Sequence, residues 1–410
     1  MPVQLFEQGL SKDALRRLII SFILRDQQKR AKQGLVQSDQ ALTPMIFGKQ
    51  TAEIDAIEVT EETLGFDSLG TLELILGLNR FFDLNQSGVE DYLLIKRRIG
   101  DWINLLSQHR QIVGDAWAFG FATSGSTGDA RVVPHLAETL WSEMRSQVAG
   151  PFSEVSAPGR IVLLVPPHHI YGFLFGCVLP DILGIEVIDL HRDGPGAAFR
   201  HARSGDLVVG TPYNWDMLQK IDRQFVNGVY GVTSAGPSSA TTWDSVARGN
   251  LARLTEVYGS TETGGIATRS GFAEPFELLP HLEMSDKRIL RRIDGEPLPL
   301  QDRLEWISPN RFHLRGRLDH VVQVAGVNVS PQHIRDRILG VDGVADAAVR
   351  MGATRLKAFV VPKSGMDTAD LQHRLQAHVF STLEATARPE SLTFGDHLPR
   401  NEMGKAADWS

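Results

Sequence analysis

Residues 123–131 read TSGSTGDAR, and the first two of them also end the strand-like run WAFGFATS at 117–124. The first six positions hold two glycines and four hydroxyl residues. Glycine lets a backbone approach a ligand closely, so such a loop can wrap a polyphosphate with N–H and O–H donors. Arg131 adds a fixed positive charge. The stretch is not a Walker A loop, which needs GxxxxGK followed by Ser or Thr, and a polar surface turn is the alternative interpretation.

From this part of the chain onward, short β-rich runs alternate with helical patterns. The β-rich runs are WAFGFATS, RIVLLVPP, GIEVIDL, DLVVGTP and LTEVYGS, and HLAETLWSEMRSQV is one of the helical patterns between them. This alternation, which starts at about residue 117, predicts an α/β domain with largely parallel strands. Ligands bind beyond the carboxyl ends of the strands in such sheets, and the unusual polar motifs of this chain fall at those ends.

Upstream, the first 110 residues are predicted to be mostly helical, with helices over residues 13–30 and 96–110. The stretch GFDSLGTLEL, residues 65–74, resembles the segment on which carrier proteins hold phosphopantetheine, which would make Ser68 the modified residue. The alternative is that Asp67 or Ser68 caps an amphipathic helix that packs on the following domain. In that interpretation the apolar face consists of Leu69, Leu72, Leu74 and Leu76.

Residues 311–331 open a smaller unit of short strands and two helices. We therefore expect a large N-terminal domain over 1–316 and a small, mobile α+β domain over 317–410, with the joint at GRLD. Within the large domain, residues 1–112 form the helical, carrier-like segment and residues 113–316 the α/β part.

Composition narrows the classes of partner. The chain has 410 residues and a net charge of −7, which does not suggest nucleic acid or anionic membrane as a partner. No apolar run approaches the length of a membrane span, and the start lacks the pattern of a signal peptide. The single cysteine, Cys177, lies in an apolar stretch and is expected in the core. A reducing cytoplasm is the expected location, and the oligomeric state stays open.

A second polar motif, EVYGSTETGG, covers residues 256–265 and follows a strand. It offers an aromatic face at Tyr258, a tight turn at Gly259, and a carboxylate at Glu262. A carboxylate beside a phosphate loop is a natural Mg²⁺ ligand. The chain ends on LPRNEMGKAADWS, where Lys405 follows a glycine on an expected loop.

Four motifs, TSGSTG, YGSTE, GRLD with the following G and V-x-P, and LPRN with GK, occur in the order found in the adenylate-forming superfamily. That superfamily contains acyl-CoA synthetases, peptide-synthetase adenylation domains and luciferases, and the resemblance covers about residues 115–410. It implies a reaction in which a carboxylate attacks the α-phosphorus of ATP, with Mg²⁺ present, and a thiol then takes the acyl group from the adenylate.

The resemblance also implies roles for single residues. The residues that it implies for binding the β- and γ-phosphates of ATP are Thr123, Ser124, Gly125, Ser126, Thr127, Gly128 and Arg131. Contacts to adenine, ribose and the α-phosphate fall on Ala235, Gly236, Pro237, Tyr258, Gly259, Ser260, Thr261 and Arg317. The Mg²⁺ ligand is Glu262 with Thr127 nearby, the hinge is Asp319, and Gly326 lies by the thiol tunnel. Lys405 bridges the carboxylate and the α-phosphate, and the catalytic set is Lys405, His169, Thr261 and Glu262.

Two departures from the family pattern stand out. The family's TGD motif, whose Asp holds the ribose hydroxyls, is absent upstream of GR at 316–317, and counting back fourteen residues from Gly316 assigns that role to Asp302. The family usually has Gly-x-Pro-Lys where this chain has GDAR, so Arg131 keeps the charge but not the geometry of lysine.

The acid is inferred from PPHHIYGFLFG, residues 166–176, which resembles the family segment whose His lies near the carboxylate. The expected substrate residues are His169, Tyr171, Phe173, Trp215, Ser234, Gly264 and Gly265. An aromatic slot favours an aryl acid over a fatty acid, and no Asp is placed to hold an amino group. The chain length resembles that of short aryl-acid ligases, with 4-hydroxybenzoate or a related hydroxybenzoate as the leading substrate and 4-coumarate as the alternative.

The acceptor is CoA or an acyl carrier protein. A non-catalytic nucleotide-binding or carrier-like homologue is the alternative of another class, although such a homologue would be expected to lose Glu262 or Lys405. A serine hydrolase is disfavoured because no GxSxG motif fits.

Overall fold

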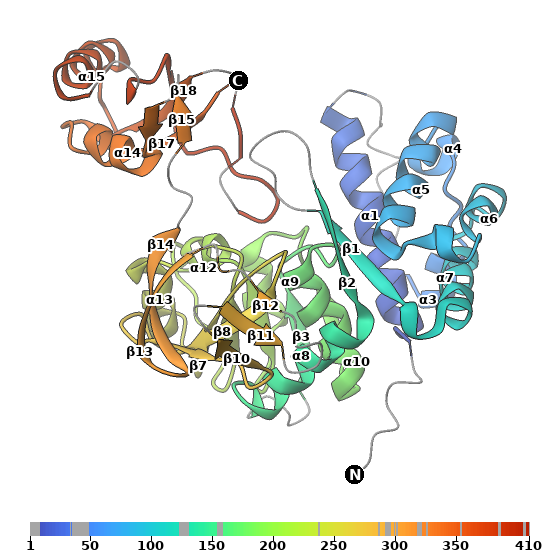
Figure 1. Ribbon diagram of the computed structural model, residues 1–410. Coiled ribbons are helices and arrows are strands. Elements are labelled where there is room, and N and C mark those ends of the chain that lie inside the picture. Colours follow the sequence, from blue (N-terminus) through green and yellow to red (C-terminus); the bar gives the residue numbers. More distant parts are fainter. Residues whose placement is uncertain are drawn as a thin grey trace. The chain divides into compact units, whose positions relative to one another are not determined.

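The computed structural model describes residues 9–32, 34, 49–122, 131–153, 159–236, 238–285, 288–291, 297–298, 300, 302–317, 322–324, 327–352, 355–383, 387–404 and 407–409. The chain divides into two compact units, one of residues 1–283 with 290–296 and the other of residues 284–289 with 297–410. Figure 1 shows the elements of both units.

The first part of the chain is helical. Its elements are α1 (Lys12–Lys32), α3 (Thr51–Asp55), α4 (Glu61–Leu64), α5 (Ser68–Phe82), η2 (Leu84–Gln86), α6 (Glu90–Ile95), α7 (Ile99–Val113) and η3 (Gly114–Ala116). Helix α1 contacts α5, α7 and η5 (Leu174–Val178), so even its polar residues Arg16, Gln27 and Arg30 are buried. The helix predicted over residues 13–30 is confirmed.

Helix α5 buries a different face from the one predicted. Leu74 is fully buried, but Leu69, Leu72 and Leu76 are 65%, 41% and 42% exposed. The inward positions are instead Gly70, Thr71, Leu74, Ile75, Leu78, Phe81 and Phe82. These residues recur every three to four positions. Leu69, Leu72 and Leu76 also share one face at that spacing, but it is the exposed face, opposite to that of Leu74, so the predicted apolar face was wrong.

A large mixed sheet forms the centre of the first unit. Its strands are β3 (Ile161–Leu163), β4 (Val187–Asp189), β5 (Leu207–Gly210), β6 (Tyr230–Thr233), β7 (Arg253–Ser260), β8 (Gly264–Arg269) and β9 (Phe276–Leu278), in the order β9-β8-β7-β6-β5-β3-β4. The five from β7 to β4 in that order are parallel, and β8 and β9 are antiparallel to their neighbours. The predicted parallel-rich α/β domain is confirmed.

The strand predicted over residues 117–124 has another partner. It forms β1 (Ala118–Ala122), which pairs antiparallel with β2 (Val132–Leu136) in a separate two-stranded sheet. Ala122 lies opposite Val132, so the end of β1 and the start of β2 lie side by side. Phe119 and Phe121 of β1 pack edge-on or tilted against Phe81 of α5 and Phe173, which joins the ribbon to the helical part of the unit.

Helices complete the first unit: α8 (Ala137–Ala149), α9 (Ile170–Phe173), α10 (Leu179–Leu183), η6 (Pro195–Ala197), α11 (Ala198–His201), α12 (Pro212–Leu218) and α13 (Ala240–Arg248). One core cluster packs strand residues such as Val162, Val208 and Leu254 against Trp215 of α12. Cys177 is buried in η5, where burial raises the pKa of its thiol to about 12. Strands β10 (Leu282–Ser285), β11 (Arg288–Arg291) and β12 (Pro297–Leu298) follow in the chain.

The second unit holds the antiparallel hairpin of β13 (Asp302–Ser308) and β14 (Arg311–Arg317) and the paired short strands β15 (Val322–Val324) and β16 (Val327–Val329). Its core lies between α14 (Pro331–Leu339), α15 (Thr368–Thr382) and a sheet of β17 (Val344–Met351), β18 (Leu356–Pro362) and β19 (Ser391–Phe394). This small sheet with two helices confirms the predicted α+β architecture.

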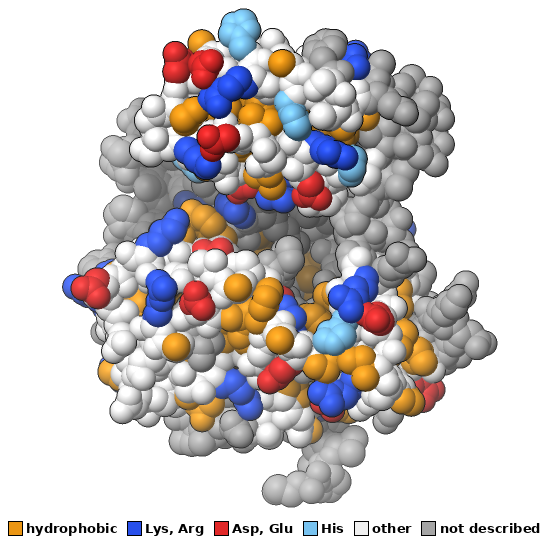
Figure 2. Space-filling view, turned by 90° about the vertical axis from the view of Figure 1, so that its left-hand side faces the viewer, with side chains coloured by type: hydrophobic (Ala, Val, Ile, Leu, Met, Phe, Trp, Pro, Cys, Tyr) orange, Lys and Arg blue, Asp and Glu red, His pale blue; other side chains and the backbone are white. Residues whose placement is uncertain are grey.

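No helix among the described residues is long and apolar enough to cross a membrane. On the face drawn in Figure 2, basic and acidic side chains are interspersed with apolar ones.

Candidate active site

The motif at 256–265 forms the turn between β7 and β8. Ser260 and Thr263 close it, because the Ser260 N–H donates to Thr263 Oγ1 at 3.1 Å and the Thr263 N–H donates to Ser260 Oγ at 3.3 Å. Thr261 and Glu262 lie between these two residues, and the Glu262 side chain is exposed. The turn therefore presents a carboxylate to solvent from a closed backbone frame.

Glycine is required at two positions of this turn. A Cβ on Gly259 would lie 2.1 Å from the carbonyl oxygen of Gly264, so any side chain there would push the two strands apart. Gly264 has a φ of 70°, a conformation that residues with a Cβ rarely adopt. Tyr258, directly before the turn, is half-buried with its ring 5.7 Å from that of Phe276.

The end of β6 lies beside β7, with Thr233 opposite Glu256 in parallel register. Ser234, which follows β6, donates its hydroxyl to the Val257 carbonyl at 2.8 Å. Ala235 has a φ of 73°, which costs energy for a residue with a Cβ. Strained backbone clusters at functional sites, and this residue is where the adenine edge was expected.

A buried ion pair supports the same loop. Glu256 accepts a hydrogen bond from Arg269 at 2.6 Å, and its other carboxylate oxygen accepts one from the Ser238 N–H at 3.2 Å. The carboxylate thus ties β7 and β8 to the backbone just after Pro237.

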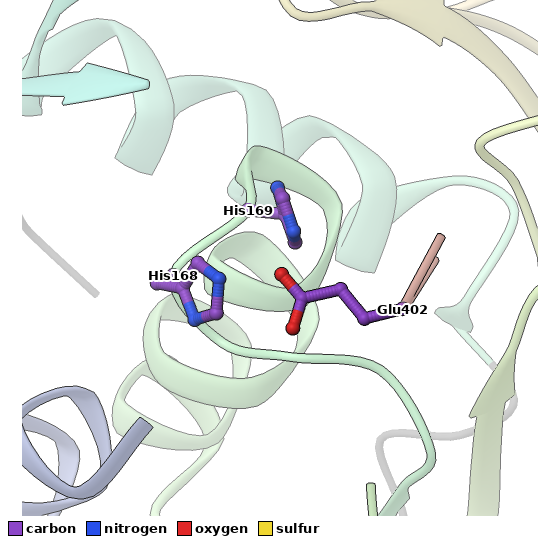
Figure 3. Close-up of side chains that lie close together, drawn as sticks. All are labelled: His168, His169 and Glu402. Atoms are coloured by element: carbon purple, nitrogen blue, oxygen red, sulfur yellow. The ribbon is translucent and has the colours of Figure 1, made fainter. Parts of the chain in front are cut away.

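After β3, the chain turns at Pro166 and starts α9, with His169 as the residue before the first turn. The neighbouring His168 is buried and shares a hydrogen bond of 2.7 Å between Nδ1 and Ser21 Oγ of α1. The two imidazole rings lie 4.5 Å apart and point from the same loop (Figure 3), and His169 is the more exposed of the two.

Three of the expected substrate residues are core residues in this structure. The Tyr171 hydroxyl donates to the carbonyls of Gly210 and Val232, each at 3.0 Å, and burial raises the pKa of this phenol. Trp215 Nε1 donates to the Val232 carbonyl at 3.3 Å, and Phe173 packs among other aromatic rings. Their role in substrate binding stays a prediction. The two hydrogen bonds of Tyr171 link the ends of β5 and β6.

The polar segments after β3, β5, β6 and β7 lie at one edge of the sheet, because these strands are parallel neighbours. His169, Ser234, Ala235, Thr261 and Glu262 come from three of them. Gly264 and Gly265 begin β8 and are buried. Sequence-distant candidates therefore lie at the edge where open α/β sheets bind ligands.

In the second unit, Asp302 is the first residue of β13 and lies opposite Arg317, the last residue of β14. Arg131 directly precedes β2, and its side chain is exposed. The other predicted site residues lie outside the described residues: Thr123, Ser124, Gly125, Ser126, Thr127, Gly128, Pro237, Asp319, Gly326 and Lys405.

Two residues that the sequence did not single out contact the turn. His135 Nε2 lies 2.7 Å from the Thr261 carbonyl oxygen, and the Gly265 N–H donates to Glu143 Oε1 at 2.8 Å. A histidine within a short strand and a glutamate within a helix carry no local signal, since their partners lie more than a hundred residues away.

The donor chemistry fits the nucleotide and metal implied by the sequence. An exposed carboxylate on a rigid turn suits Mg²⁺, which takes one or two protein oxygens together with phosphate oxygens and waters. Exposed Arg131 adds positive charge at the start of β2.

Comparison with known proteins gives a consistent picture. The model of the AMP-binding enzyme family matches residues 30–301, and that of the AMP-binding enzyme C-terminal domain matches residues 336–405. A 4-coumarate–CoA ligase of Cereibacter sphaeroides is 40% identical over 98% of this chain and 98% of its own length.

More distant matches agree. A 3,4-dihydroxybenzoate–[aryl-carrier protein] ligase of Bacillus anthracis is 22% identical over 70% of this chain and 71% of its own length. The ATP-bound structure of MatB from Rhodopseudomonas palustris matches with a TM-score of 0.54 at 17% identity, over 95% of this chain and 91% of that one.

Proposed function

Because the chain belongs to the family of AMP-binding enzymes, we propose that it joins 4-coumarate to CoA through a coumaroyl-adenylate. The observation that carries the proposal is the 40% identity to a 4-coumarate–CoA ligase over nearly the full length of both chains. The sequence alone favoured a hydroxybenzoate, and this relative moves the preference to the alternative, 4-coumarate. The expected cytoplasmic location belongs to the proposal.

In the first step the carboxylate of the acid attacks the α-phosphorus of ATP, and pyrophosphate leaves. Two anions must approach each other, so positive charge at the reacting atoms lowers the barrier. Lys405 supplies that charge between the carboxylate and the α-phosphate. Arg131 and the loop at 123–128 hold the β- and γ-phosphates, and Glu262 holds Mg²⁺, which neutralises phosphate charge when bound.

In the second step the thiol of CoA attacks the carbonyl carbon of the adenylate, and AMP leaves with the bonding electrons. The two steps need different groups at the reacting carbon. Lys405 has to leave the reacting carbon before the thiol arrives. A hinge at Asp319 would allow this exchange of groups. Asp302 and Arg317 hold the ribose through both steps.

A second candidate is transfer of a hydroxybenzoate to an aryl carrier protein. The similarity to a 3,4-dihydroxybenzoate–[aryl-carrier protein] ligase favours it, though over less of the chain and at lower identity. The two candidates differ in the spacing between ring and carboxylate and in the acceptor thiol.

The test is ATP–pyrophosphate exchange with 4-coumarate, cinnamate, 4-hydroxybenzoate, 3,4-dihydroxybenzoate and a fatty acid, followed by thioester formation with CoA or an aryl carrier protein. We expect the highest kcat/KM with 4-coumarate and thioester only with CoA. Faster exchange with a hydroxybenzoate would favour the second candidate. No exchange with any acid would leave the non-catalytic homologue.

A further inference from the structure

We propose that His135 and Glu143 are positioning residues of the adenylation step, which fix the backbone of the turn that carries Thr261 and Glu262. The inference rests on the proposed function and deepens it. Neither side chain is among the residues proposed to contact ATP or the acid. Each acts through a backbone group of the turn, one on either side of Glu262.

The first contact comes from β2. His135 is 7% exposed, and its Nε2 lies 2.7 Å from the Thr261 carbonyl oxygen. A carbonyl oxygen only accepts, so Nε2 carries the proton and donates. The backbone of β2 is itself fixed, because His135 lies opposite Phe119 in the β1–β2 ribbon and its ring stands edge-on to Phe121.

The second contact comes from α8. Glu143 is fully buried, and its Oε1 accepts from the Gly265 N–H at 2.8 Å and from Gln147 Nε2 at 3.1 Å. Burying a carboxylate costs several kcal/mol unless hydrogen bonds compensate for the lost water. A carboxylate buried at such a cost beside Gly265 indicates that the backbone of Gly265 has to be held in one position.

Gly265 and Glu143 fit each other closely. A Cβ on Gly265 would lie 2.7 Å from Glu143 Oε1, so a side chain there would displace the carboxylate. The close approach of Glu143 therefore explains why residue 265 is a glycine. The space expected for a flat substrate ring is a second reason.

The two contacts do what the turn's internal bonds do not. The bonds between Ser260 and Thr263 fix the shape of the turn, whereas His135 and Glu143 fix its position relative to the β2–α8 segment. That segment begins directly after residues 123–131, where the phosphate grip is proposed. The described stretch from Arg131 through β2 and α8 thus holds the turn that carries Glu262, and misplacement of reacting groups by about 1 Å can cost about 100-fold in rate.

The alternative is that both contacts only stabilise the fold. Conservative variants separate the two interpretations, because the side-chain amide introduced by E143Q still offers a carbonyl oxygen to the Gly265 N–H. In the same way, the amide nitrogen introduced by H135Q can donate as Nε2 does. The matched control is M144A, which removes a fully buried side chain from the same helix without removing a hydrogen bond to the turn.

Two readouts are measured for E143A, E143Q, H135A, H135Q and M144A. The first is hydrogen–deuterium exchange of the peptide covering residues 256–269. We expect it to exchange about tenfold faster in E143A and H135A, near the wild-type rate in E143Q and H135Q, and near it in M144A. Unchanged exchange in both alanine variants overturns the inference, whatever the enzyme's activity.

The second readout is ATP–pyrophosphate exchange as a function of Mg²⁺ and 4-coumarate. In E143A and H135A we expect kcat to fall about 10- to 100-fold and the half-saturating Mg²⁺ concentration to rise, with KM for 4-coumarate within about twofold of wild type. An equal loss of kcat in M144A would mean a merely structural role and would overturn the inference. Wild-type protein that exchanges with no acid would instead remove the proposed function, and the deuterium result would still decide the positioning.

Discussion

Asp302 and Arg317 lie directly opposite each other, at the open end of the hairpin formed by β13 and β14. Asp302 lies fourteen positions before Gly316 in the sequence, and the hairpin brings the two ends together. The residue that was assigned to the ribose by counting, in the absence of the usual motif, therefore has the assigned Arg317 as its cross-strand neighbour. This placement supports a shared ribose-binding role for the pair.

For Asp302 we expect D302A to raise KM for ATP by about tenfold, since a hydrogen bond to a charged group contributes about 1.5–3 kcal/mol. The variant should also lose discrimination between ATP and 2′-deoxy-ATP, because the contact is to the ribose hydroxyls. Steady-state pyrophosphate exchange with the two nucleotides measures both effects.

The control is E305Q, which changes an exposed carboxylate on the same strand. It should leave KM for both nucleotides unchanged. If D302A still prefers ATP over 2′-deoxy-ATP by the wild-type factor, Asp302 does not hold the ribose.

For Lys405 we expect K405A to lower the rate of adenylate formation by about 100- to 1,000-fold, as loss of a preorganised charge at a transition state does. The thioester-forming step should proceed at close to the wild-type rate when synthetic coumaroyl-AMP and CoA are supplied. K363A, which removes an exposed lysine paired with Asp342 in the same unit, serves as the control. Equal loss of both half-reactions in K405A would contradict the assignment.

For Ser68 we expect S68A to keep wild-type adenylation and thioester formation. Its side chain is exposed, and the capping of α5 is done by Asp67, which accepts from the Gly70 N–H at 2.7 Å and pairs with Arg30. The D67A variant should in contrast lose about 1 kcal/mol of stability in urea unfolding.

Mass spectrometry of the intact chain, produced together with a phosphopantetheinyl transferase, tests the carrier-like alternative for Ser68. We expect the unmodified mass. A gain of one phosphopantetheine group that S68A abolishes would show that the chain carries an acyl group as well as activating one.

For Cys177 we expect negligible reaction with thiol reagents in the native protein at pH 8. Burial raises the pKa of this thiol from 9.0 to about 12, and only the thiolate is nucleophilic. The same shift makes stability depend on pH. Above about pH 9 the unfolded thiol loses its proton while the folded one keeps it, so stability falls as pH rises.

At pH 10 this effect amounts to about 1.4 kcal/mol relative to pH 8, because each unit beyond the unfolded pKa costs about 1.4 kcal/mol. Urea unfolding of wild type and C177A at both pH values measures it. A wild-type protein that loses no more stability than C177A between pH 8 and pH 10 would contradict the raised pKa.

Much of the fold follows from local pattern. The runs ending in GTP and YGS predicted β5 and β7, because short apolar runs before turn residues are typical of buried parallel strands. The partner of a strand is a tertiary property, and so the strand before residue 123 was placed in the wrong sheet. Helix α5 shows the same limit, since four leucines within eight positions do not define which side meets α1 and β1.

The candidate site was likewise predictable only where its residues lie in local motifs. Thr261, Glu262 and Ser234 were recognisable from motifs, which are local. His135 and Glu143 were not, because their significance lies in contacts with residues 126 and 122 positions away.

Tyr171 and Trp215 show the converse. Aromatic side chains near a motif suit a ligand slot and a core equally well in the sequence. Only the hydrogen bonds to strand carbonyls distinguish a packed side chain from one that is free to line a pocket.

The positive φ of Ala235 has a consequence for sequence variation at this position, which is proposed to line adenine. A Cβ costs roughly 1–2 kcal/mol in this left-handed conformation, so replacement by glycine would relieve strain while β-branched residues would add to it. The replacements that this conformation tolerates best are therefore Gly, Asn and Asp, whatever acid the enzyme is asked to accept. Ala235→Gly is a starting background whose added stability can absorb substitutions made elsewhere to redesign substrate preference.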